Sequence, residues 1–116
     1  MDLNHLHLHV RDIPSARRFY ETHFGFRTET VREEGFLIVR NPEGFDLAFM
    51  HDPKPAPLPS WFHFGFRLPN RKAVRTLQDA MAREGVPIIR PVEDHGSWVS
   101  FRCADPDGHN IEIYCE

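Results

Sequence analysis

Polar and apolar residues alternate along the first strand-like segment of the chain. Within Leu3–Val10, Leu6, Leu8 and Val10 alternate with His5, His7 and His9. A period of two residues is typical of a β-strand with one apolar face. The sequence therefore predicts a strand over Leu3–Val10 that carries three histidines on its polar face.

A helix and three further strands are predicted in the rest of the first half. Asp12 suits an N-cap and Pro14 the first turn, apolar residues then recur at helical spacing up to Phe24, and Gly25 ends the helix. Apolar runs and turn residues predict the later strands. These are Arg27–Arg32, Phe36–Arg40 and Phe45–Met50.

The second half repeats this order of elements. Apolar residues alternate with Trp61, His63 and other residues up to Leu68, which predicts a strand. Asn70 caps a helix that Gly85 closes. Three strands follow at Val86–Arg90, Trp98–Cys103 and His109–Tyr114.

The repeat extends to individual residues. The segment that starts at His5 matches the one that starts at His63, and the segment from Asn41 matches the one from Asp105. In this alignment Glu112 of the second copy corresponds to Ala48 of the first. A repeat that duplicates a histidine but keeps one carboxylate offers two imidazoles and one acid to a shared centre. That is a ligand set for a divalent metal ion.

Between the copies lies a spacer with proline at alternate positions. Residues 51–60 therefore favour extended polyproline conformation and cannot form a continuous helix. At about 3.1 Å per residue, this spacer fits a site within one chain or one shared between subunits. The sequence predicts one domain over residues 1–116, with module one at 1–50 and module two at 61–116.

Each module has the order βαβββ and is too small to bury a two-sided core alone. We therefore expect an α+β fold in which the two modules pack side by side with their helices outside. The polar faces would then form a concave mixed sheet around a shared site.

Composition excludes several classes of protein. With 116 residues and 41% hydrophobic content the chain fits one globular domain, and a net charge of −3 provides no basic surface for nucleic acid. The N-terminus lacks the pattern of a signal peptide and no apolar run reaches membrane-spanning length, so we expect a cytoplasmic protein that uses no membrane. Cys103 and Cys115 are widely spaced and are interpreted as buried, reduced thiols.

Several motifs together resemble a known superfamily. They are a histidine early in the first strand, a helix that ends in Phe24-Gly25-Phe26, a second histidine that opens the next module, and Asp105-Pro106-Asp107-Gly108 followed by Glu112. This order resembles the vicinal oxygen chelate superfamily, which includes glyoxalase I, type I extradiol dioxygenases, fosfomycin-resistance enzymes and bleomycin-resistance proteins. The resemblance implies that His5, His63 and Glu112 bind a divalent metal ion, with iron, manganese, zinc, cobalt and nickel all compatible.

Ala48 narrows the choice within that superfamily. Glyoxalase I usually has a fourth ligand, a carboxylate, at this position, whereas the extradiol dioxygenases and fosfomycin enzymes use two histidines and one glutamate. Three protein ligands leave positions open for a small oxygen-bearing substrate that chelates the metal. The resemblance therefore implies extradiol-dioxygenase-like or lyase-like chemistry.

The chain also departs from the specialised members. His7 stands where the fosfomycin enzymes have a hydroxyl residue, and Arg102 stands where many extradiol dioxygenases have a tyrosine. Gly44-Phe45-Asp46 replaces the segment that holds the acid–base histidine of the dioxygenases. We interpret His7 as a candidate general base and Arg102 as a candidate oxyanion partner.

Aromatic residues are the candidates for contact with a substrate. Trp61, Trp98 and Phe101 are predicted to line an aromatic substrate pocket, with core packing as the alternative. The Asp105 and Asp107 pair is interpreted as a turn, because Asn110 occupies the position of the invariant glycine of an EF-hand loop.

Three functional hypotheses follow. The first, which we prefer, is a mononuclear metalloenzyme that acts on a small oxygen-bearing, including aromatic, molecule. The second is a metal-free sequestering protein like the bleomycin-resistance members, and the third is a structural or regulatory module that kept the ligands by ancestry. Members of similar size commonly form dimers, so a homodimer is expected.

Overall fold

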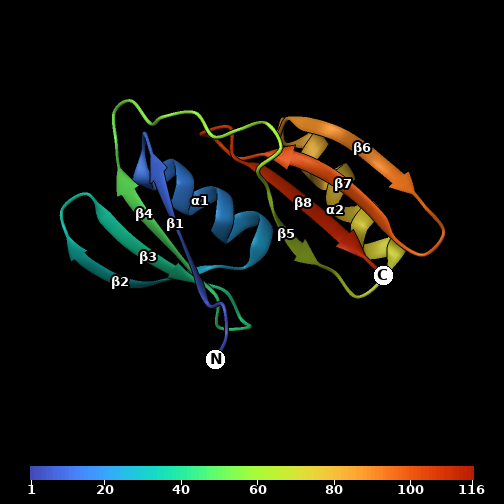
Figure 1. Cartoon of the computed structure of the whole chain (residues 1–116), viewed down its shortest axis with the longest axis horizontal. Helices are drawn as coiled ribbons and strands as arrows, with labels where there is room; N and C mark the ends of the chain where they lie inside the picture. The colour runs from blue at the N-terminus through green and yellow to red at the C-terminus, as the bar shows by residue number, and fades with distance from the viewer. The chain divides into compact units, whose positions relative to one another are not determined.

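A computed structural model describes residues 1–116, except for the side chains of Arg32 and Glu33. The chain divides into two compact units, Met1–Pro57 and Leu58–Glu116, and each consists of a four-stranded sheet and one helix (Figure 1).

The first unit contains one helix and four strands. Its elements are β1 (His5–Val10), α1 (Ile13–Phe24), β2 (Arg27–Glu33), β3 (Phe36–Arg40) and β4 (Asp46–His51). The strand order is β1-β4-β3-β2, in which β1 runs parallel to β4 and the other neighbours are antiparallel. The sheet is mixed because α1 carries the chain from β1 to β2 at the opposite edge, so that β2 runs in the same direction as β1. Short turns then join β2, β3 and β4, which are antiparallel to one another in sequence.

The second unit repeats this topology. Its elements are β5 (Phe64–Arg67), α2 (Arg71–Arg83), β6 (Ile88–Asp94), β7 (Val99–Ala104) and β8 (Asn110–Cys115). The strand order is β5-β8-β7-β6, in which β5 runs parallel to β8 and the other neighbours are antiparallel. The predicted α+β class and the two βαβββ modules are confirmed.

Both helices begin where side-chain capping was predicted. Asp12 accepts a hydrogen bond from the Ser15 amide at 3.1 Å, and Asn70 accepts one from the Ala73 amide at 2.8 Å. Gly25 ends α1 with φ of 71°, a left-handed conformation that is strained for residues with a side chain.

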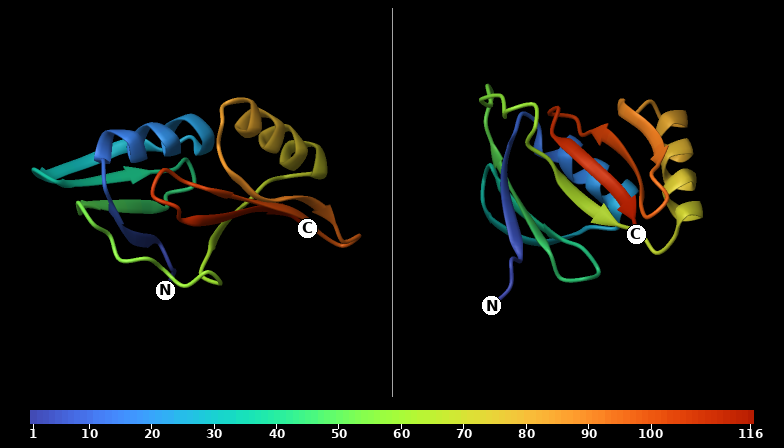
Figure 2. Two further views of the ribbon diagram at one scale, coloured as in Figure 1. Left: turned by 90° about the horizontal axis from the view of Figure 1, so that it is seen from above. Right: turned by 45° about the vertical axis from the view of Figure 1, so that its right-hand side comes forward.

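Each core lies between a sheet and its own helix. Figure 2 shows each helix against one face of the sheet of the same unit. In the second unit, Ile111 and Ile113 are fully buried and alternate with Glu112 along β8. Helix α2 contributes the buried residues Val74 and Met81. The helix-free face of this sheet therefore carries the polar members of each strand.

Strand β6 differs from the prediction. It starts at Ile88 and runs to Asp94, whereas the sequence predicted a strand over Val86–Arg90. Pro91 lies inside it, and the pairing with β7 shifts register on both sides of Arg90. Because β6 is an edge strand, a proline without an amide hydrogen is tolerated there.

The two cysteines are free and buried, as predicted. Burial, and to a lesser degree the charge of Asp105, raises the pKa of the Cys103 thiol to about 12. At neutral pH this thiol is protonated and unreactive. None of the described helices is both long and apolar enough to cross a membrane.

Candidate functional site

A row of polar positions crosses the helix-free face of the second sheet. Glu112 on β8 lies in register with Gly65 on β5 and with Arg102 on β7. Arg102 in turn lies in register with Arg90 on the edge strand β6. Side chains that are in register on adjacent strands project from the same face. The fold therefore places an acid next to a guanidinium, with a glycine on the other side of the acid.

Arg102 contacts two of the residues that were predicted to bind a metal ion, His63 and Glu112. Its Nη2 lies 3.7 Å from Glu112 Oε2 and 3.5 Å from His63 Nε2. The side chains of Arg102 and Glu112 are only 17% and 22% exposed. The structure thus brings together His63, Arg102 and Glu112, which come from three separate segments of the chain.

A backbone hydrogen bond fixes the tautomer of His63. Its Nδ1 lies 3.0 Å from the carbonyl oxygen of Trp61. A carbonyl oxygen only accepts hydrogen bonds, so Nδ1 carries the proton and Nε2 keeps its lone pair. Histidines that bind metals in proteins are typically held in this way by a second hydrogen bond.

Gly65 leaves space beside Glu112. A Cβ atom at Gly65 would lie 3.1 Å from the Glu112 carbonyl oxygen and 3.6 Å from the Glu112 Cβ. A side chain at this position would therefore require the Glu112 backbone to shift by a few tenths of an ångström. The space above Gly65 is bordered by Glu112 and by the Tyr114 ring, whose Cε1 would lie 3.7 Å from that Cβ.

Two buried polar atoms on this sheet have no hydrogen-bond partner among the described residues. They are Arg102 Nε, a donor, and Asn110 Oδ1, an acceptor. Asn110 lies on the same face of β8 as Glu112, two positions earlier. Because buried polar groups nearly always have partners, each of these atoms would bind a water molecule or a polar group of a ligand.

The first unit has the same register with different chemistry. On its sheet His7 pairs with Ala48, and Ala48 pairs with Ile38. This row corresponds to Gly65, Glu112 and Arg102 of the second unit, so the structural register supports the alignment of Ala48 with Glu112. The first sheet therefore has neither the acid nor the guanidinium of that row.

His5 and His7 both lie on β1 with exposed side chains. His5 Nδ1 donates to the Asn4 side-chain oxygen at 2.9 Å, which leaves the Nε2 lone pair of His5 available. The His7 ring lies 5.3 Å from that of His9 and 6.2 Å from that of Phe36, between ring centroids. Within the fully described part of the chain, the His7 ring nitrogens make no hydrogen bond.

The three aromatic candidates lie in different environments. Phe101 is 0% exposed and alternates with Arg102 along β7, so it belongs to the core and not to the face that carries Glu112. Trp61 is 72% exposed and supplies the carbonyl that orients His63. Trp98 is 36% exposed and stacks on His95, with ring centroids 4.1 Å apart. Phe101 thus has a packing role, whereas Trp61 lies next to the proposed ligand.

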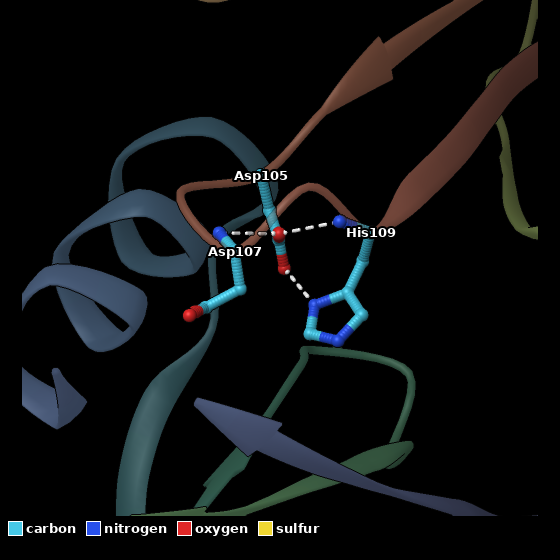
Figure 3. A group of neighbouring side chains, drawn as sticks. All are labelled: Asp105, Asp107 and His109. Atoms are coloured by element: carbon cyan, nitrogen blue, oxygen red, sulfur yellow. Dashed lines mark hydrogen bonds and ion pairs between the residues drawn. The ribbon is translucent and has the colours of Figure 1, made fainter. Parts of the chain in front are cut away.

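A second cluster of possible metal ligands lies in the turn before β8. Single ligand atoms of Asp105, Asp107 and His109 lie within 4.8 Å of one another (Figure 3). Asp105 Oδ1 accepts from the amides of Asp107 and His109, both at 2.9 Å, and Oδ2 lies 2.7 Å from His109 Nδ1. The turn was predicted from the sequence, whereas the contact of Asp105 with His109 was not. The four-residue spacing of the two was the available signal.

The equivalent turn of the first unit explains this cluster. There Asn41 Oδ1 accepts from the amide of Phe45 at 2.8 Å, as Asp105 does from His109. Both turns contain a glycine with positive φ, Gly44 at 89° and Gly108 at 84°. Asp105 therefore organises the turn before β8, and its carboxylate oxygens already have partners.

Replacing Asp105 by Ala should lower the free energy of unfolding by about 2–4 kcal/mol, since two partly buried amides and His109 lose their acceptor. Asp105→Asn keeps an acceptor oxygen, as Asn41 does, and should cost about half as much or less. Urea denaturation of the three proteins measures the difference. Equal losses in the two variants would show that the carboxylate charge, and not the turn, is what matters.

Comparison with known proteins agrees with this fold. The family model described as Glyoxalase/Bleomycin resistance protein/Dioxygenase superfamily matches residues 2–113. An uncharacterized protein from Pseudomonas aeruginosa is 30% identical over 128 residues, which cover 96% of this chain and 86% of that protein.

Solved structures of other proteins share this fold. A possible glyoxalase from Bacillus cereus is 30% identical, with a TM-score of 0.86 and 99% of each chain covered. The fosfomycin resistance protein FosX from Listeria monocytogenes has a TM-score of 0.86 at 18% identity, over 100% of this chain and 93% of that one, and shows the shared fold. The chain belongs to the Glyoxalase/Bleomycin resistance protein/Dioxygenase superfamily.

Proposed function

We propose that this protein is a metal-dependent enzyme that binds a small oxygen-bearing substrate, aromatic ones included. The proposed ligands are His63 and Glu112 from the second unit and His5 from the first. The observation that carries the proposal is that His63 Nε2 and Glu112 Oε2 lie 3.5 Å and 3.7 Å from the same atom, Arg102 Nη2, so that an imidazole and a carboxylate converge on one point.

The residues of the second unit fit a divalent metal ion. An imidazole held at Nδ1 and a carboxylate with a glycine beside it are suitable donors, and a second imidazole from His5 would complete the set. Iron, manganese, zinc, cobalt and nickel all accept such ligands. When bound, the metal would act as a Lewis acid on a substrate oxygen.

Other residues have proposed roles in dioxygenase-like or lyase-like chemistry. Arg102 would donate hydrogen bonds to a substrate oxygen that develops negative charge. His7 is exposed on β1 and would serve as a general base. Trp61 and Trp98 offer exposed aromatic surface for a substrate ring. A homodimer remains our expectation.

A second candidate function is metal-free sequestration of a small molecule. One observation favours it: Arg102 already supplies a positive charge to Glu112 and a hydrogen-bond donor to His63. Because Arg102 already provides a partner for both His63 and Glu112, these two residues do not need a metal ion to stabilise them.

Metal analysis of protein purified without an affinity tag tests the first function. We expect about one transition-metal ion per chain after equilibrium dialysis against manganese, iron, cobalt, nickel or zinc, because the proposed donors form a single centre. His63→Ala should lose the metal, whereas His95→Ala should keep it, since His95 is not a proposed ligand and lies in the turn between β6 and β7, where it stacks on Trp98. Substoichiometric metal that is unchanged by His63→Ala would refute the enzyme proposal and favour sequestration.

A further inference from the structure

Arg102 contacts the two side-chain atoms that would bind the proposed metal ion, His63 Nε2 and Glu112 Oε2. Its Nη2 lies 3.5 Å from His63 Nε2 and 3.7 Å from Glu112 Oε2. The neutral imidazole has one lone pair at Nε2, so this atom cannot accept from a guanidinium and bind a metal at the same time. Two positive charges at one carboxylate would also repel each other strongly at a site that is mostly buried.

We propose that the Arg102 guanidinium occupies the metal position in the metal-free protein and leaves His63 and Glu112 when these residues bind a metal ion. The released guanidinium then binds an anionic group of the substrate. This inference rests on the metal-dependent function proposed above. It adds a class of substrate, one that carries a carboxylate, phosphonate or similar oxyanion.

The surroundings of Arg102 explain why an anion is needed. Its side chain is 17% exposed, and Glu112 is its sole carboxylate partner among the described side chains. Its neighbour on the other side in the sheet is Arg90, another cation. A guanidinium that left Glu112 would remain largely buried without a counterion, which is costly.

The geometry of a guanidinium suits an oxyanion. Arginine presents several N–H groups in one plane and binds carboxylate or phosphate oxygens in pairs. Arg102 Nε is buried and has no partner in the described structure, so it offers a donor in addition to Nη2. Because Nε is buried while Arg102 contacts Glu112, an anion would reach this donor only after the guanidinium has moved.

Metal and anion binding should be coupled. If the anion stabilises the released guanidinium, it removes the competitor of the metal, and by linkage the metal strengthens anion binding by the same factor. Neither effect requires a change in the sheet.

Calorimetric titration of metal-free protein with Mn²⁺, with and without methylphosphonate or acetate, tests the proposal. Arg102→Met keeps much of the stem but removes the charge, and should bind Mn²⁺ about 5-fold or more tightly than the wild-type protein, a change the size of a lost ion pair. Either anion should strengthen Mn²⁺ binding in the wild-type protein and have no effect in Arg102→Met. Arg90→Met removes a charge one strand further away and should behave like the wild-type protein.

The outcomes separate this inference from the proposed function. If the wild-type protein binds Mn²⁺ but Arg102→Met binds it equally or more weakly, the displacement is refuted and the metal site stands. If an anion strengthens binding equally in Arg102→Met, the anion site is refuted. If the wild-type protein binds no metal, both proposals fall.

A further variant at the same position separates the positive charge of Arg102 from its Nε donor. Arg102→Lys keeps the charge but lacks Nε, so it should retain the competition with Mn²⁺ and lose most of the anion effect. Thermal unfolding confirms that each variant is folded before titration.

Discussion

Replacing Glu112 by Gln should weaken metal binding by about 100-fold or more, because losing even an outer partner of a metal ligand costs about 10- to 100-fold. Glutamine has nearly the same shape, but its amide oxygen is neutral and a much poorer ligand than a carboxylate. The main-chain pairing of β8 with β5 and β7 does not involve this side chain, so the sheet should persist. Equilibrium dialysis with Mn²⁺ measures the change.

A matched control is available on the same part of the chain. Glu116→Gln removes a carboxylate just beyond β8 that lies 3.8 Å from Arg67 and is largely exposed. This variant should bind metal within about twofold of the wild-type protein, because exposed ion pairs contribute little. Similar affinities for Glu112→Gln and the wild-type protein would exclude Glu112 as a ligand.

The largest effect on stability is expected from Phe101→Ala, which should lower the free energy of unfolding by about 3–5 kcal/mol. Phe101 is 0% exposed and pairs in register with Ile113, which is also fully buried. Removing the ring leaves a cavity on the helix-facing side of β7, and the neighbouring strands can close it only in part. Urea denaturation followed by circular dichroism measures the loss.

Comparison with two other variants separates packing from substrate contact. Phe101→Leu should lose markedly less stability, since most of the buried volume is kept. Trp61→Ala should change stability by less than about 0.5 kcal/mol, because Trp61 is 72% exposed. A small loss of stability in Phe101→Ala together with weaker ligand binding would instead assign Phe101 to the substrate pocket.

The repeat in the sequence predicted much of this fold for a clear physical reason. Strand and helix periods, the capping residues Asp12 and Asn70, and Gly25 are local signals, and local signals determine where elements begin and end. The alignment of Ala48 with Glu112 also agrees with the register of both sheets.

The parts that were not predicted depend on pairing between distant segments. The contact of Arg102 with His63 and Glu112 requires the order β5-β8-β7, which no local pattern specifies. The continuation of β6 through Pro91 depends on its place at the edge of the sheet. The position of Phe101, in contrast, follows from strand parity, because neighbours such as Phe101 and Arg102 face opposite sides of a strand.

The division of the chain into units has a consequence for how the proposed ligands meet. Every strand pairing of the second sheet lies within Leu58–Glu116, so His63, Arg102 and Glu112 are arranged by that unit alone. His5, the proposed third ligand, belongs to Met1–Pro57. The second unit therefore supplies two of the three proposed ligands by itself, and the third belongs to a unit with its own sheet and core.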